Sequence, residues 1–82
     1  DVWSSMGEEN KKEEKENLFN GYTLDSDLLK KANNEAIVLH CLPAYRNKEI
    51  TDEVIDSKKS RIFQQAENRL HAQQALLACL LT

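Results

Sequence analysis

The sequence predicts an α/β fold, namely a partial three-layer domain in which helices flank a fragment of a doubly wound parallel sheet. Residues 36–40 (Ala-Ile-Val-Leu-His) form a continuous apolar run of strand length, bounded by Asn33-Asn34 and by Pro43. A run without alternation is typical of a strand buried on both faces of a parallel sheet. Residues 65–81 carry apolar side chains at helical spacing. We therefore expect a helix-rich chain with one clear central strand.

The chain length limits how complete this fold can be. Its 82 residues suffice for one small domain, and domains of this size bury little apolar core. One strand cannot make a sheet, so further strands must come from outside the chain or from Asp1-Val2-Trp3 as the stub of one. The chain also begins at Asp1 without a Met. We therefore expect residues 1–82 to be a fragment of a larger domain.

Local sequence signals predict the remaining elements. Good helix formers fill residues 8–19, and Gly21 supplies a stop. Asp25 or Ser26 can cap a short helix, and Thr51 can cap a helical turn. The complete expected order is a charged helix at 8–19, a short helix at 27–32, the strand at 36–40, a helical turn at 51–55, a short strand at 61–63 and a C-terminal helix at about 65–81.

Composition excludes several classes of function. The net charge of −3 argues against nucleic acid as a partner, because phosphate binding needs concentrated basic residues. The longest apolar stretch, residues 75–81, is far shorter than the ~20 residues that span a bilayer, so no membrane association is expected. Cys41 and Cys79 lack CxxC partners, which indicates an intracellular, cytoplasmic protein without a disulfide. The spacing of His40, Cys41 and His71 does not match a zinc site, so we expect no metal and no cofactor.

The most distinctive motif, His40-Cys41-Leu42-Pro43, lies where the expected strand ends. Ligands of open α/β sheets bind outside the carboxyl ends of the strands, and a thiol at that position has chemistry that depends on its surroundings. The alternative is that Cys41 is a small buried hydrophobe beside a turn proline. On the residues alone this packing role is the preferred interpretation.

Two further positions are candidates for binding. Asp1 precedes a loop with Ser5, and together they could hold an amino group, although an ordinary connection with a Ser cap explains the same residues. Arg69 falls near the start of the C-terminal helix, where a cation opposes the helix dipole. That placement points to a bidentate grip on a phosphate or carboxylate. A salt bridge to Glu67 or another acid is the alternative.

Three stretches occur together and in order, and they resemble the ornithine carbamoyltransferase family. They are Asp-x-x-x-Ser-Met-Gly at 1–7, His-Cys-Leu-Pro-Ala-x-Arg at 40–46 and Ala-Glu-Asn-Arg-Leu-His-Ala-Gln at 66–73. Residues 51–56 (Thr-Asp-Glu-Val-Ile-Asp) also fit. The resemblance covers essentially the whole chain, and the ordered set is far more specific than any one motif.

The resemblance implies transfer of a carbamoyl group from carbamoyl phosphate to the side-chain amine of L-ornithine, giving L-citrulline and phosphate in arginine metabolism. It implies roles for individual residues as well. Asp1, Ser5 and Met6 would bind ornithine, and Cys41 would be catalytic as the proton acceptor. The residues that would bind carbamoyl phosphate are Cys41, Leu42 and Arg69.

The resemblance also implies partners. Family members are typically homotrimers, and their carbamoyl-phosphate domain carries Ser-x-Arg-Thr and His-Pro-x-Gln motifs that this sequence lacks. We therefore expect the isolated chain to be inactive without that N-terminal domain. Two alternatives stay open. One is a fragment of a putrescine-type carbamoyltransferase, against which the Ser-Met-Gly loop argues. The other is a non-catalytic, small helical interaction module that pairs helix 65–81 with a partner.

Overall fold

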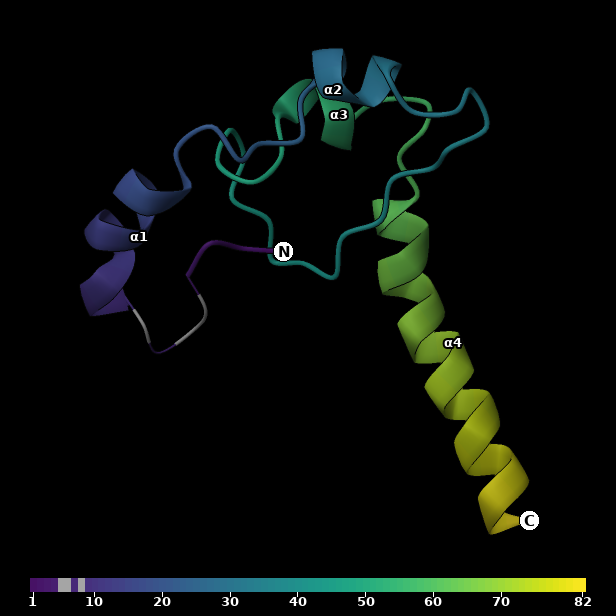
Figure 1. Cartoon of the computed structure of the whole chain (residues 1–82). Helices are drawn as coiled ribbons and strands as arrows, with labels where there is room; N and C mark the ends of the chain where they lie inside the picture. The colour runs from purple at the N-terminus through teal and green to yellow at the C-terminus, as the bar shows by residue number, and fades with distance from the viewer. Residues whose placement is uncertain (5–6, 8) are drawn as a thin grey trace.

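A computed structural model describes residues 1–4, 7 and 9–82, which form a short 3-10 helix and four α-helices (Figure 1). The two middle helices, α2 and α3, lie against each other, while α4 extends away from them as a long rod. The principal extents are 50 × 37 × 16 Å. The elements are η1 (Glu9–Lys11), α1 (Lys12–Phe19), α2 (Ser26–Lys30), α3 (Asp52–Ile55) and α4 (Ile62–Leu81).

The three shorter α-helices lie close to where the sequence predicts them. Helix α1 ends at Phe19, and Gly21 follows with φ of +94°, a conformation that glycine adopts at little cost. Asp25 caps α2, since its carboxylate accepts a hydrogen bond from the Leu28 amide at 2.8 Å. Thr51 occupies the N-cap position of α3 without a side-chain cap bond. The helix-forming residues, the glycine stop and the Asp25 cap therefore located these helices to within a few residues, although only α2 has a side-chain cap.

Helix α4 begins at Ile62, three residues before its expected start, and the short strand expected at 61–63 is wrong. The Gln65 amide already donates to the Arg61 carbonyl at 2.8 Å, which is helical bonding. Ile62 is completely buried and anchors the first turn of the helix. Its β-branched side chain therefore serves packing at a helix start and not pairing in a sheet.

The central strand expected at 36–40 is not formed within the described residues. Only Val38 pairs there, through an isolated parallel bridge to Ser60 in which its amide donates to Lys59 and its carbonyl accepts from Arg61. Burial alternates as well: Val38 and His40 are buried, while Ile37 and Leu39 are more than half exposed. A strand needs repeated bonds to a neighbour, and here one residue has them.

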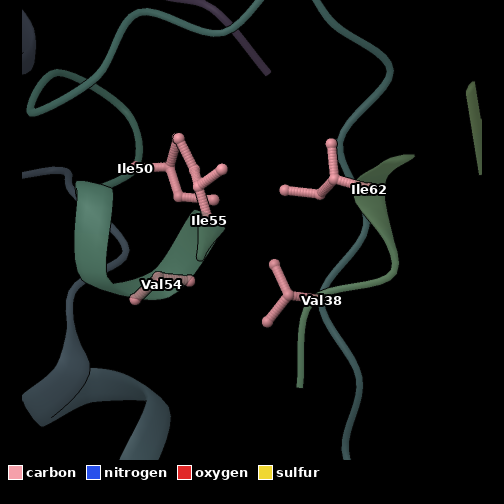
Figure 2. Close-up of a cluster of buried hydrophobic side chains, with 5 residues drawn as sticks. All are labelled: Val38, Ile50, Val54, Ile55 and Ile62. Carbon is pink, nitrogen blue, oxygen red and sulfur yellow. The ribbon is translucent and has the colours of Figure 1, made fainter. Parts of the chain in front are cut away.

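The core is small and joins the middle of the chain to the start of α4. Figure 2 shows Ile50, Val54 and Ile55 facing Val38 and Ile62. Each fully buried aliphatic side chain contributes about 1.5–3 kcal/mol relative to an exposed one. The partly buried side chains that pack against this core are Leu24, Leu29, Leu42 and Ala44. The core thereby reaches the loop after His40 through Leu42.

Beyond its first turn, α4 is uncovered in this chain. Leu70, Leu77 and Leu81 are 65%, 56% and 80% exposed, although their spacing predicts a buried face. The long helix is therefore attached to the rest of the described chain mainly through Ile62. No helix among the described residues is both long and apolar enough to cross a membrane.

Truncating Ile62 tests whether this small core holds the fold together. We expect Ile62→Ala to lower the free energy of unfolding by about 2–5 kcal/mol, because it removes a fully buried side chain and leaves a cavity. Urea unfolding of the 82-residue chain followed by circular dichroism measures this. Phe63→Ala is the matched control, since Phe63 is 59% exposed. Equal losses in both variants would contradict the core described here.

Candidate functional site

The loop after Val38 is organised by the buried imidazole of His40. The Leu42 amide donates to His40 Nδ1 at 2.8 Å, and an amide can only donate, so Nδ1 carries the lone pair. The ring proton is therefore on Nε2, which lies 2.9 Å from Glu49 Oε1. Both side chains are only 4% exposed. One tautomer of His40 thus satisfies a backbone donor and a buried carboxylate together.

Further bonds hold the two ends of this loop. The His40 amide donates to Gln65 Oε1 on α4, and the Tyr45 amide donates to Glu49 Oε1, both at 2.9 Å. Between them Leu42 has φ of +59°, and the Leu42–Pro43 peptide is cis. A positive φ is uncommon for a branched side chain and persists only where the surroundings enforce it. The hydrogen bonds and the packing of Leu42 on the core supply that enforcement.

This loop brings Cys41 to Asp1, forty positions earlier in the chain. Cys41 Sγ donates to Asp1 Oδ1 over 3.8 Å, and the same oxygen accepts from the Val2 amide at 2.7 Å. Cys41 is exposed, so its interpretation as a small buried hydrophobe is wrong. The thiol and the carboxylate share one solvent-accessible position at the tip of the loop.

Arg69 faces the same hollow as Cys41. A groove of about 480 Å³ is lined by Cys41, Gln65, Ala66, Asn68, Arg69 and Ala72. Within the part of the chain that is described, the Arg69 guanidinium makes no hydrogen bond or ion pair. Glu67 instead lies 3.2 Å from His71 Nε2, so the salt bridge between Arg69 and Glu67 is wrong. An unpaired guanidinium beside a thiol can receive an anionic group.

Ser5 and Met6, the other candidates for binding ornithine, lie outside the described residues. The chain before them is held by aromatic contacts. The rings of Trp3 and Phe19 stack with centroids 6.2 Å apart, and Trp3 Nε1 donates to the Tyr22 carbonyl at 3.3 Å. These contacts fix the direction in which the chain leaves Asp1.

The far end of the loop is tied to α3 by Arg46. Its guanidinium contacts Asp52 Oδ1 at 2.8 Å and Asp56 Oδ2 at 3.1 Å. Hydrogen bonds to Asp52 and then to Asp56 raise the pKa of Arg46 above its ordinary value. Arg46 therefore remains a cation and is committed to these two acids. Among the residues described, no three His, Cys, Asp or Glu side chains are grouped to hold a metal.

Neither Glu49 nor Gln65 was predicted from the sequence, yet both accept hydrogen bonds from the backbone of the loop. Glu49 is one of fourteen acidic residues, and nothing in its local pattern marks it as buried. The available signal was indirect. A histidine at the end of an apolar run needs a buried partner for its ring, and a nearby carboxylate or amide had to supply one.

Comparisons with known proteins identify the family of this chain. The family described as aspartate/ornithine carbamoyltransferase, Asp/Orn binding domain, matches residues 1–80. The ornithine carbamoyltransferase of Prochlorococcus marinus subsp. pastoris is 74% identical over 81 residues, which are 99% of this chain and 26% of the relative. The solved Pyrococcus furiosus enzyme superposes with a TM-score of 0.81 at 51% identity, over 94% of this chain and 25% of that one. The anabolic Campylobacter jejuni enzyme gives 0.85 at 48% identity, over 96% and 26%.

The matched model defines the class as the amino-acid-binding domain of a carbamoyltransferase. The chain belongs to the aspartate/ornithine carbamoyltransferase family. These relatives are named ornithine carbamoyltransferases, and the chain spans about a quarter of their length. The α/β class expected from the sequence agrees with these neighbours, and the helix-rich character is confirmed.

Removing the imidazole of His40 tests its structural role. We expect His40→Ala to lower the free energy of unfolding by about 1–3 kcal/mol, because the Leu42 amide and the buried Glu49 carboxylate each lose a partner. Chemical denaturation of the chain measures this. His71→Ala removes an exposed imidazole that also faces a carboxylate and should change little. A His40→Ala midpoint equal to that of the unmodified chain would contradict the assignment.

Proposed function

We propose that the chain is the C-terminal part of the ornithine-binding domain of an ornithine carbamoyltransferase. The reaction moves the carbamoyl group of carbamoyl phosphate to the side-chain amine of L-ornithine and yields L-citrulline and phosphate, as in arginine biosynthesis. One observation carries the proposal. Cys41 Sγ lies 3.8 Å from Asp1 Oδ1 at the tip of the loop, and Cys41 lines the same groove as Arg69.

The three groups suit the two halves of this reaction. An alkylammonium has a pKa near ~10.4 and must lose a proton before it attacks. Asp1, with Ser5 and Met6, would hold ornithine so that its amine lies beside Cys41. As the proposed proton acceptor, Cys41 would take the ammonium proton in its thiolate form and become a thiol. The amine nitrogen then attacks the carbamoyl carbon, and the bond from that carbon to the phosphate oxygen breaks as phosphate leaves.

Arg69 is suited to the phosphate side of the reaction. Its guanidinium has no partner among the described side chains and can form two parallel hydrogen bonds to a phosphate. Such a cation offsets the charge that builds up on the oxygens as the tetrahedral intermediate forms and collapses. Cys41 and Leu42 would contact the carbamoyl end of the same substrate. Leu42 is fixed for this purpose by its bond to His40.

The groove lined by Cys41 and Arg69 would be one half of the active site, and the rest of the enzyme would complete it. The groove is open, and most of the acceleration in a two-substrate reaction comes from holding both reactants in place. An N-terminal carbamoyl-phosphate domain would close the groove, and the complete enzyme would be a cytoplasmic homotrimer. In that enzyme, residues 36–40 would become the central strand of the doubly wound sheet. The exposed faces of Ile37 and Leu39 support this role.

Citrulline formation tests the proposal. We expect none from the 82-residue chain alone, because it holds only half of the groups that bind the substrates. We expect turnover from a chimera in which this chain replaces the matching 81 residues of the Prochlorococcus marinus subsp. pastoris relative. Putrescine offered in place of ornithine tests the alternative substrate. An inactive but well-folded chimera, or a preference for putrescine, would overturn the proposal.

Substitutions in the same chimera test the individual roles. We expect Arg69→Met to lower kcat about 10²–10³-fold, as loss of a group that stabilises transition-state charge does, and Cys41→Ala to lower it measurably. Lys58→Met removes an exposed cation and Cys79→Ala an exposed thiol, and both should retain activity. Equal effects of Arg69→Met and Lys58→Met would refute the role of Arg69.

A further inference from the structure

We propose that Glu49 is a positioning residue for the loop at residues 40–45, which carries Cys41 and Leu42. It acts through the location of one carboxylate oxygen and not through the charge of the carboxylate. This inference rests on the proposed function for its kinetic consequences. Its structural part stands alone. Glu49 is 7% exposed and His40 is 8% exposed, so the contact between them is shielded from water.

One carboxylate oxygen of Glu49, Oε1, accepts two hydrogen bonds from the loop. It accepts from His40 Nε2 at 2.9 Å and from the Tyr45 amide at 2.9 Å. His40 begins the loop and Tyr45 ends it, so a single atom ties both ends together. Hydrogen bonds in a buried, low-dielectric setting are stronger than exposed ones. Oε1 therefore determines how far apart the two ends of the loop, His40 and Tyr45, are held.

Glu49 also affects Leu42 indirectly, because it orients the imidazole of His40 and His40 accepts the bond from the Leu42 amide. The hydrogen bond at one ring nitrogen of a histidine sets the proton location at the other. Because Glu49 Oε1 accepts the hydrogen bond from Nε2–H, Nδ1 keeps its lone pair and accepts from the Leu42 amide at 2.8 Å. Without Glu49 the ring could rotate or change tautomer, and the Leu42 amide would lose its acceptor.

Leu42, at the centre of the loop, has a strained backbone conformation. Leu42 has φ of +59°, a conformation that costs free energy and needs external support. Its neighbour Cys41 touches Asp1 Oδ1 at 3.8 Å and lines the groove with Arg69. Relaxation at Leu42 would move the thiol away from Asp1 and change its place in the groove. The carboxylate of Glu49 thereby controls a thiol that it does not contact.

The second oxygen of Glu49 separates geometry from charge. Oε2 is buried and has no hydrogen-bond partner among the residues that the structure describes, and both of the bonds that hold the loop use Oε1. A glutamine can place its carbonyl oxygen at the same point and accept both bonds. An aspartate keeps the charge, but it is one methylene shorter and cannot reach both donors. We therefore expect Glu49→Gln to preserve the loop and Glu49→Asp to disturb it.

Alkylation of Cys41 measures the loop without relying on activity. Each variant is made in the full-length chimera and treated with iodoacetamide, and mass spectrometry of the Cys41 peptide gives the rate. We expect Glu49→Gln to stay within about twofold of the unmodified chimera. Glu49→Asp and Glu49→Leu should react severalfold faster, because the Cys41 thiol no longer donates to Asp1. Glu35→Gln and Glu35→Leu change an exposed glutamate and should leave the rate unaltered.

Kinetics test the same order where the chimera makes citrulline. Glu49→Asp should lower kcat/KM for carbamoyl phosphate about tenfold or more, since small displacements of a reacting group have effects of this size. Glu49→Gln should stay within threefold while its melting temperature falls, because its amide group is buried without an acceptor. A Gln variant as impaired as the Asp variant, or an Asp variant with unaltered alkylation and kinetics, would overturn the inference. An inactive chimera would refute the proposed function, while alkylation would still decide the role of Glu49.

Discussion

The buried contact between His40 and Glu49 is the interaction on which the candidate site depends. It joins two residues that are nine positions apart and both shielded from solvent. Through it, the amides of Leu42 and Tyr45 are satisfied by side chains and not by a neighbouring strand. Buried backbone donors require partners, so this pair makes an irregular loop possible where the chain leaves the core.

The small core and the loop support each other. Leu42 packs on the cluster of Val38, Ile50, Val54, Ile55 and Ile62, and Gln65 reaches back from α4 to the His40 amide at 2.9 Å. Ile62 and Gln65 lie one helical turn apart on α4, so one side chain fixes the helix to the core and the other fixes it to the loop. These two contacts join the start of α4 to the core and to the loop, and Cys41 and Arg69 line one groove.

The sequence predicted local features of this structure better than contacts between distant segments. Asp25 and Gly21 predicted helix boundaries because capping and chain reversal depend on neighbouring residues. The proximity of Asp1, Cys41 and Arg69 was expected only from the family resemblance, since no local rule relates positions forty residues apart. Residues 36–40 have the composition of a buried strand, but pairing depends on partners, and among the described residues only Ser60 pairs with Val38. Glu49 was not predicted because burial of a carboxylate depends entirely on tertiary packing.

The uncovered apolar surfaces are distributed in a way that fits the proposed half-site. Ile37 and Leu39 lie on the open side of the segment that leads to Cys41, and Leu70 and Leu77 lie on α4 beyond Arg69. Both sets of side chains are more than half exposed in this structure. The charge stabilisation proposed for Arg69 would be strong only where water is excluded, and the groove that Arg69 lines is open to solvent. Under the proposed function, the N-terminal domain that closes the groove would exclude water from it.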